Sequence, residues 1–153
     1  MNFKTTEKYF YALFEKLGFV ARSAYMIREF GEVNVVAIAR KGFGKQVVVD
    51  IGFWLNNLHA MRASKVEECH LYIRLERLVP QLREDFLMAA DYGNESQYES
   101  MRKFESFFES FFPVILSNLT SEVGLAFALR SGELDYAIVR KEARQFLQKK
   151  VAQ

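Results

Sequence analysis

The stretch EECHLYIRLERL, residues 67–78, places a cysteine next to a histidine and follows them with two arginines. Cysteine and histidine are ligands of structural zinc and also form nucleophilic pairs in enzymes. The whole chain holds one cysteine, Cys69, and two histidines, His59 and His70. A structural zinc ion needs about four such ligands converging on one point. The sequence therefore predicts no metal site, and nothing in it indicates another cofactor.

The same stretch shows the alternation of a β-strand, in which successive side chains point to opposite faces. One row is apolar and is expected to be buried: Cys69, Leu71, Ile73 and Leu75. The other row is mostly polar: His70, Tyr72, Arg74 and Glu76. In this register Cys69 and His70 point apart, so they cannot act as a nucleophilic pair. We expect a buried and chemically inert cysteine.

A neighbouring strand is predicted over residues 46–55, where the period of two is clearest. Its core row is Val47, Val49, Ile51, Phe53 and Leu55. Asp50 and Trp54 lie on its other face and are expected to meet the polar row of the later strand. The candidate binding residues are therefore Asp50, Trp54, His70, Tyr72 and Arg74.

Three interpretations of this polar sheet face remain open. Trp, Tyr and Arg are frequent anchors of protein interfaces, which favours a non-enzymatic binding module such as an adaptor or a toxin-neutralising immunity protein. Alternatively, Asp50, His70 and Arg74 could serve a small-ligand binder or a hydrolase-like enzyme, with the carboxylate orienting the histidine. A plain solvated sheet face has the same composition. The sequence carries no catalytic signature, so we favour the protein-binding interpretation.

The elements that position these residues begin with a helix over residues 5–17, with Thr5 or Thr6 as the N-cap and Gly18 as the stop. From residue 19 to 55 the apolar period is two and glycines mark the turns, which predicts three strands in two hairpins. Residues 56–67 have no clear period and are expected to be a long connection that carries function or crosses the sheet edge. The strand in the stretch EECHLYIRLERL is the fourth.

The C-terminal half predicts about four helices that pack on the sheet. The first follows Pro80 and ends at Gly93. The second carries the aromatic run FESFFESFF, residues 104–112, with Pro113 expected to kink or end it. Phe104, Phe108 and Phe111 are expected to be core, although such a stripe is also compatible with a hydrophobic ligand site. Helices over about 120–130 and 133–150 complete an α+β fold in a single domain, residues 1–153.

The composition excludes several classes of partner. With 21 Lys and Arg against 19 Asp and Glu, the net charge of +2 does not favour nucleic-acid binding. No apolar run is long enough to span a membrane. A single cysteine rules out an internal disulfide and is typical of a protein in a reducing compartment, so we expect a cytoplasmic protein. The oligomeric state is left open.

The order of short motifs resembles a known family. A first helix that ends in LGF is followed by VVVDIGFW, ECHLYIRLERL and SFFPVILSNLTS. This order is similar to a bacterial family described only as domain of unknown function 4304, over roughly residues 5–120. The resemblance implies the same α+β architecture. It implies no activity and no site residues, because the family has no established function that transfers to these positions.

Overall fold

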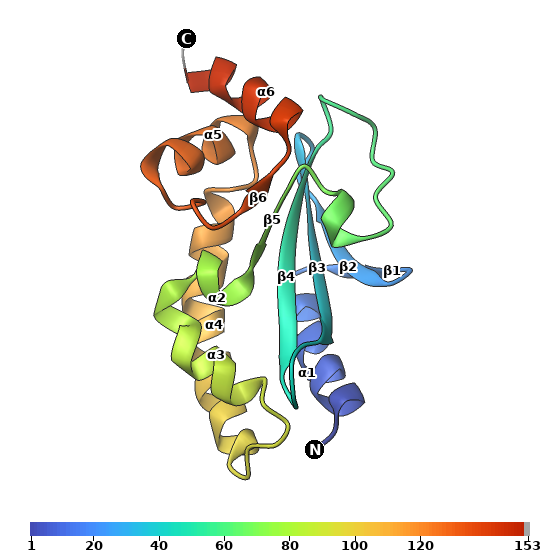
Figure 1. Cartoon of the computed structure of the whole chain (residues 1–153), viewed down its shortest axis with the longest axis vertical. Helices are drawn as coiled ribbons and strands as arrows, with labels where there is room; N and C mark the ends of the chain where they lie inside the picture. The colour runs from blue at the N-terminus through green and yellow to red at the C-terminus, as the bar shows by residue number, and fades with distance from the viewer. Residues whose placement is uncertain (152–153) are drawn as a thin grey trace.

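The computed structural model describes residues 1–151 and has an α+β fold with an N-terminal helix, an antiparallel sheet and C-terminal helices (Figure 1). The sheet has six strands, and neighbours in the chain are neighbours in the sheet. Their bounds are β1 Val20–Arg22, β2 Tyr25–Glu29, β3 Val33–Lys41, β4 Val47–Leu55, β5 Leu71–Arg74 and β6 Ile138–Val139. The prediction of four strands is therefore wrong, because β1 and β6 have three and two residues and are too short to show a period of two.

The observed helices agree more closely than the strands with those predicted from the sequence. The N-terminal helix is α1 Phe3–Lys16, and the four predicted C-terminal helices are α3 Arg83–Ala89, α4 Gln97–Ser117, α5 Glu122–Ser131 and α6 Lys141–Val151. A single extra turn, α2 Leu75–Leu78, and two short 3-10 helices, η1 Val66–Glu68 and η2 Pro80–Leu82, complete the set. None of the single helices within residues 1–151 is long and apolar enough to cross a membrane; only the bent pair α4 and α5 passes, by length and composition.

Several predicted helix ends are wrong for local reasons. Asn2, and not Thr5 or Thr6, caps α1, because its side chain accepts a hydrogen bond from the backbone N–H of Thr5. Pro113 does not end α4, which continues for four residues beyond it to Ser117, and the alternative of a kink at this proline stays a prediction. Helix α6 begins at Lys141 instead of 133, because Ile138 pairs with Tyr72 and adds an edge strand to the sheet.

One face of the sheet carries the main core. The odd-numbered row of β4 from Val47 to Leu55 packs there with α1 and α4, as predicted. Phe14 of α1 meets Phe108 and Phe112 of α4 edge to face, with ring centroids 5.5 and 5.6 Å apart. Phe111 does not belong to this core: its side chain is 42% exposed, because it lies on the outer side of α4. The aromatic run is therefore core on one side only.

The opposite face of the sheet is covered as well, by the connection between β4 and β5. In Figure 1 this connection runs on the other side of β4 from helices α2 to α5. Tyr25 donates its hydroxyl hydrogen to the carbonyl oxygen of Ala63 at 2.8 Å, and Trp54 donates its indole N–H to that of His59 at 2.8 Å. These two bonds fasten the connection to the sheet. A small second core forms beneath it: Tyr25, Ile27, Val36, Trp54, Ala63 and Cys69.

Cys69 is buried as predicted, but on the other face of the sheet. It follows η1 and precedes β5, so the predicted strand register of Cys69 with Leu71 is wrong. Leu75 likewise leaves the row, because it begins α2. Gly52 makes room for the cysteine: a Cβ atom at that position would lie 2.8 Å from the Cys69 sulfur. The absence of a side chain on Gly52 allows the connection to approach β4 closely.

Candidate functional site

The five predicted binding residues do not form an open sheet face. Trp54, Asp50 and His70 are buried, Tyr72 is half-buried and Arg74 is exposed. The expectation of an uncovered patch is therefore wrong, because residues 56–70 fold back over this side of the sheet.

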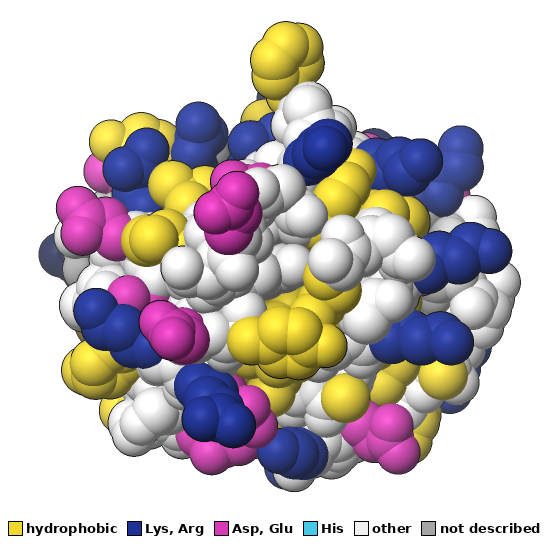
Figure 2. Space-filling view, turned by 90° about the horizontal axis from the view of Figure 1, so that it is seen from below, with side chains coloured by type: hydrophobic (Ala, Val, Ile, Leu, Met, Phe, Trp, Pro, Cys, Tyr) yellow, Lys and Arg dark blue, Asp and Glu magenta, His cyan; other side chains and the backbone are white. Residues whose placement is uncertain are grey.

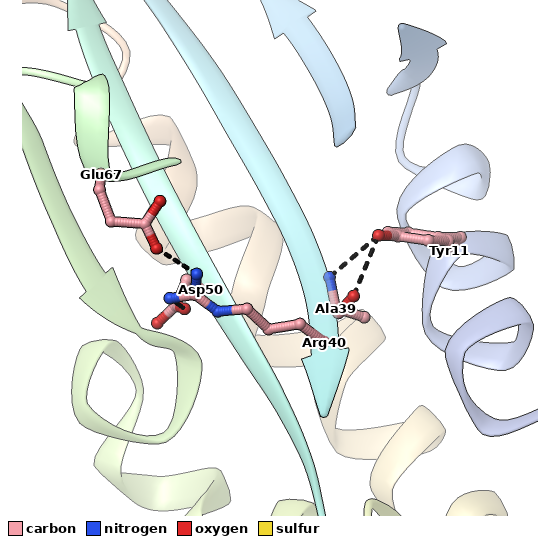
Figure 3. Close-up of polar contacts among 5 residues, drawn as sticks. All are labelled: Tyr11, Ala39, Arg40, Asp50 and Glu67. Carbon is pink, nitrogen blue, oxygen red and sulfur yellow. Dashed lines mark hydrogen bonds and ion pairs between the residues drawn. The ribbon is translucent and has the colours of Figure 1, made fainter. Parts of the chain in front are cut away.

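Asp50 belongs to a cluster of ionic side chains in the middle of the sheet (Figure 3). Its carboxylate accepts a hydrogen bond from Arg40 at 2.5 Å, and the same guanidinium donates to Glu67 of η1. Asp50 lies opposite Arg74 in the pairing of β4 with β5. The side chain of Asp50 is almost fully buried while that of Arg40 is partly exposed. The arrangement holds η1 against β3 and neutralises a buried charge, so its role is structural.

His70 and Trp54 lie elsewhere, at the end of β4 where the connection begins. Their rings are in contact, with centroids 4.3 Å apart. Nδ1 of His70 accepts a hydrogen bond from the backbone N–H of Leu55 at 2.8 Å. Nε2 of His70 lies 3.1 Å from Nδ1 of His59, and the planes of the two imidazole rings are within 21° of parallel. Both ring nitrogens of His70 are thus engaged by protein groups.

These contacts assign the proton positions of the neutral histidine pair. A backbone N–H can only donate, so Nδ1 of His70 carries no proton and Nε2 does. The N–H at Nε2 then donates to Nδ1 of His59, which leaves the proton of His59 on its own Nε2. The pair therefore ends in an N–H donor. It has no lone pair with which to abstract a proton from a substrate.

Burial lowers the pKa of His70 from 6.5 to about 4, and the nearby His59, Arg140 and Arg62 act in the same direction. Glu142 opposes them. The geometry gives the same direction, because a proton added at Nδ1 would face the N–H of Leu55. His70 is accordingly a neutral structural donor near pH 7. It does not serve as the base of the hydrolase-like hypothesis, and Asp50 bonds to Arg40 and not to this ring.

A cleft of about 130 Å³ opens beside this pair. The segments that line it, the connection between β4 and β5 and the start of α6, lie at the upper end of Figure 1. It is lined by Trp54, His59, Arg62, Glu68, His70, Arg140 and Glu142. Arg140, just before α6, is held in place by the backbone of residues 67–70. Its side chain donates to the carbonyl oxygens of Cys69 and Glu67 at 3.2 and 2.9 Å, and its own N–H donates to the carbonyl of His70 at 2.9 Å.

Four charged side chains surround the cleft, and within residues 1–151 no ion pair joins any of them. Arg62 and Arg140 carry positive charge, and Glu68 and Glu142 carry negative charge. Glu68 accepts a hydrogen bond from the hydroxyl of Ser64 at 2.8 Å. The cleft thus presents charged groups that hydrogen bonds to neutral groups hold in part but that no opposite charge neutralises.

The alternation of the strands predicts His70 and Trp54 as site residues, but it does not indicate the other five residues of the cleft: His59, Arg62, Glu68, Arg140 and Glu142. His59 and Arg62 lie in the connection without a periodic pattern, and Arg140 is about 80 residues further along the chain. The length of the connection was the available signal, because a long irregular segment in a compact domain is often functional. Among residues 1–151 no group of three or more His, Cys, Asp or Glu side chains is placed to hold a metal ion.

A second, larger hollow of about 340 Å³ lies between η2, the C-terminal end of α4 and the turn after α5. Leu78, Leu119 and Leu134 contribute apolar walls. At its rim the guanidinium carbon of Arg77 lies 5.5 Å from the centroid of the Tyr136 ring. In volume this hollow reaches the lower end of the range of small-molecule sites.

Comparison with protein-family models, with curated proteins and with solved structures finds no match to this chain. The resemblance to domain of unknown function 4304 consequently stays a prediction made from short motifs. Function has to be argued from the site.

Proposed function

We propose that the chain is a non-enzymatic protein-binding module, an adaptor or immunity-type protein of the cytoplasm, whose partner docks over the cleft at the end of β4. The observation that carries the proposal is the combination of size and charge. A hollow of about 130 Å³ is smaller than the usual small-molecule site, yet it is lined by charged groups that have no ion-pair partner among the described residues. Such a cleft suits a single side chain inserted by a larger partner.

The chemistry of the histidine pair supports binding over catalysis. In its neutral form the pair offers a donor and no base, and both nitrogens of His70 are already used. Arg140 is held by three hydrogen bonds to backbone carbonyls, so little side-chain entropy is lost when it binds a partner. A preorganised donor beside exposed residues of a loop is typical of an interface anchor.

Affinity purification of charge-reversal variants from the native cell tests this proposal. Arg62→Glu reverses a charge at the cleft, and Arg102→Glu makes the same change on the exposed side of α4. We expect a partner protein that is retained by the wild type and by Arg102→Glu and is reduced at least about tenfold with Arg62→Glu, because a buried charge contact at an interface contributes about 2 kcal/mol or more. Equal recovery with Arg62→Glu would contradict docking at the cleft.

The hollow beneath Arg77 favours one second candidate function, binding of a small amphipathic molecule. Its apolar walls and a single arginine at the rim would suit a ligand with an acidic group. Native mass spectrometry of the purified protein separates the candidates, because a retained small molecule that is lost in Leu119→Trp would favour this site.

A further inference from the structure

The segments that form the cleft are more basic than the rest of the chain. Residues 56–74 and 138–144 contain six Lys and Arg against three Glu, whereas the whole chain has 21 against 19. These two segments therefore hold more than the entire positive excess of the protein, and the remaining residues together are slightly acidic. The opposite end of the molecule mixes Lys and Arg with Asp and Glu around hydrophobic side chains (Figure 2).

Three hydrogen-bond donors converge on the cleft from different parts of the chain. His59 supplies the N–H at Nε2, which the histidine pair leaves without a partner. Arg62 also lines the cleft, and it has no hydrogen-bond partner among residues 1–151. Arg140 adds a guanidinium that backbone carbonyls orient. Planar arrays of N–H groups match the two oxygens of a carboxylate. The size of the cleft admits one such group.

The two glutamates of the cleft decide between kinds of anion. Glu68 and Glu142 lie in the same lining as the arginines. A phosphate backbone that runs across the cleft would bring repeated negative charges close to both carboxylates, which costs free energy. A single carboxylate brings one negative charge instead of several, so less of this repulsion arises, and the glutamates can then accept N–H groups from the backbone of the partner. The arrangement selects an isolated acidic side chain over a polyanion.

We infer that the partner inserts an Asp or Glu side chain into this cleft, where His59, Arg62 and Arg140 donate hydrogen bonds to its carboxylate. The inference rests on the proposed protein-binding function and adds the chemistry of the partner. The cleft is then a receptor for a peptide segment that carries one acidic residue between basic or neutral ones.

Titration with a short capped peptide tests the inference directly. The peptide carries one glutamate at its centre and glycine elsewhere, and the matched control peptide carries glutamine in its place. Trp54 is the only tryptophan of the chain and lines the cleft, so its indole N–H resonance and its fluorescence report on occupancy. We expect the glutamate peptide to bind about tenfold more tightly than the glutamine peptide, as a charge-assisted bond replaces a neutral one.

Variants and competing ligands complete the test. Arg62→Ala and His59→Ala should each weaken binding of the glutamate peptide about tenfold or more, while Arg102→Ala on α4 should leave it unchanged. A single-stranded DNA oligonucleotide and free glutamate should bind more weakly than the peptide. Tighter binding of the oligonucleotide would identify a nucleic-acid site, and equal binding of free glutamate would identify a metabolite site. Either result would overturn the inference.

The two proposals fail separately. If the glutamine and glutamate peptides behave alike, or a peptide with a central lysine binds better, the acidic partner is wrong. Protein docking at the cleft is then still tested independently by the purification with Arg62→Glu. If that purification shows no dependence on Arg62, the protein-binding function is wrong whatever the peptides do.

Discussion

His70 and His59 form a pair in which Nε2 of one ring lies 3.1 Å from Nδ1 of the other, and the backbone N–H of Leu55 donates to the remaining nitrogen of His70. This chain of bonds has one direction when both rings are neutral. It starts at the backbone N–H of Leu55, at the end of β4, and finishes at the Nε2–H of His59 in the cleft. The pair therefore holds the exposed imidazole of His59 against the end of the sheet.

The buried histidine predicts a pH-dependent stability. The pKa of His70 falls from 6.5 to about 4 in the folded protein. Between these values the unfolded chain binds more protons than the folded one, so stability is complete above pH 6.5 and is lost as the pH drops toward 4. The loss should reach about 2 kcal/mol, measured from urea unfolding at a series of pH values.

A matched variant isolates this contribution. Asn in place of His70 keeps an oxygen that can accept the N–H of Leu55 and removes the titrating ring. Its unfolding free energy should vary less with pH over the same range than that of the wild type. An unchanged pH dependence in His70→Asn would assign the effect to groups other than His70.

The contact between Gly52 and Cys69 predicts a specific steric coupling. A methyl group at position 52 would lie 2.8 Å from the sulfur of Cys69 and 2.9 Å from Cγ2 of Val66, so Gly52→Ala should destabilise by about 1–3 kcal/mol. The double variant with Cys69→Ala should recover part of the loss in thermal unfolding, because the larger obstacle is gone. Purely additive effects would mean that the connection moves aside.

The same burial makes the thiol of Cys69 unreactive. Desolvation raises the pKa of this thiol to about 12, so almost no thiolate exists near pH 7. A thiol reagent should label the native protein only at the rate of unfolding and label it at once in denaturant. Fast labelling of the native state would show that the connection opens readily.

Two phenylalanines of α4 provide a matched pair for the main core. Phe108 is fully buried between α1 and the sheet, whereas Phe111 is 42% exposed. Phe108→Ala should lower the unfolding free energy by about 3–5 kcal/mol, while Phe111→Ala should cost roughly 1 kcal/mol or less. Similar melting temperatures for the two variants would contradict this orientation of the helix.

The ion cluster around Asp50 gives the last prediction. Arg40→Met removes the partner of a carboxylate that is almost fully buried, so the loss should be about 2–4 kcal/mol, less than for a wholly enclosed pair because Arg40 is partly exposed. Glu67→Gln removes only the exposed partner of Arg40 and should cost under about 1 kcal/mol. Urea unfolding near pH 7 measures both. Equal costs would show that Asp50 draws no stability from the pair.

The sequence by itself determined the elements whose evidence is local. The periods of helix and strand predict the apolar face of α1 with Phe10, Leu13 and Phe14, and the apolar row from Val47 to Leu55. The helix face and the strand row are both buried as predicted. The α+β class and the positions of most helices follow for the same reason. The choice of Trp54 and His70 as site residues also came from the alternation.

Only the tertiary structure decided what lies on the second face of the sheet. A row of polar residues fits a solvated sheet face and a face covered by a polar loop equally well. The alternation shows which face of the sheet a residue lies on, but it does not show what packs against that face. Residues 56–70 cover that face through contacts with Tyr25 and Trp54, and they place Cys69 opposite its predicted side. The cleft joins His59 to Arg140 across 81 positions of the chain. No local period encodes this proximity, so the cleft forms only when the chain is folded.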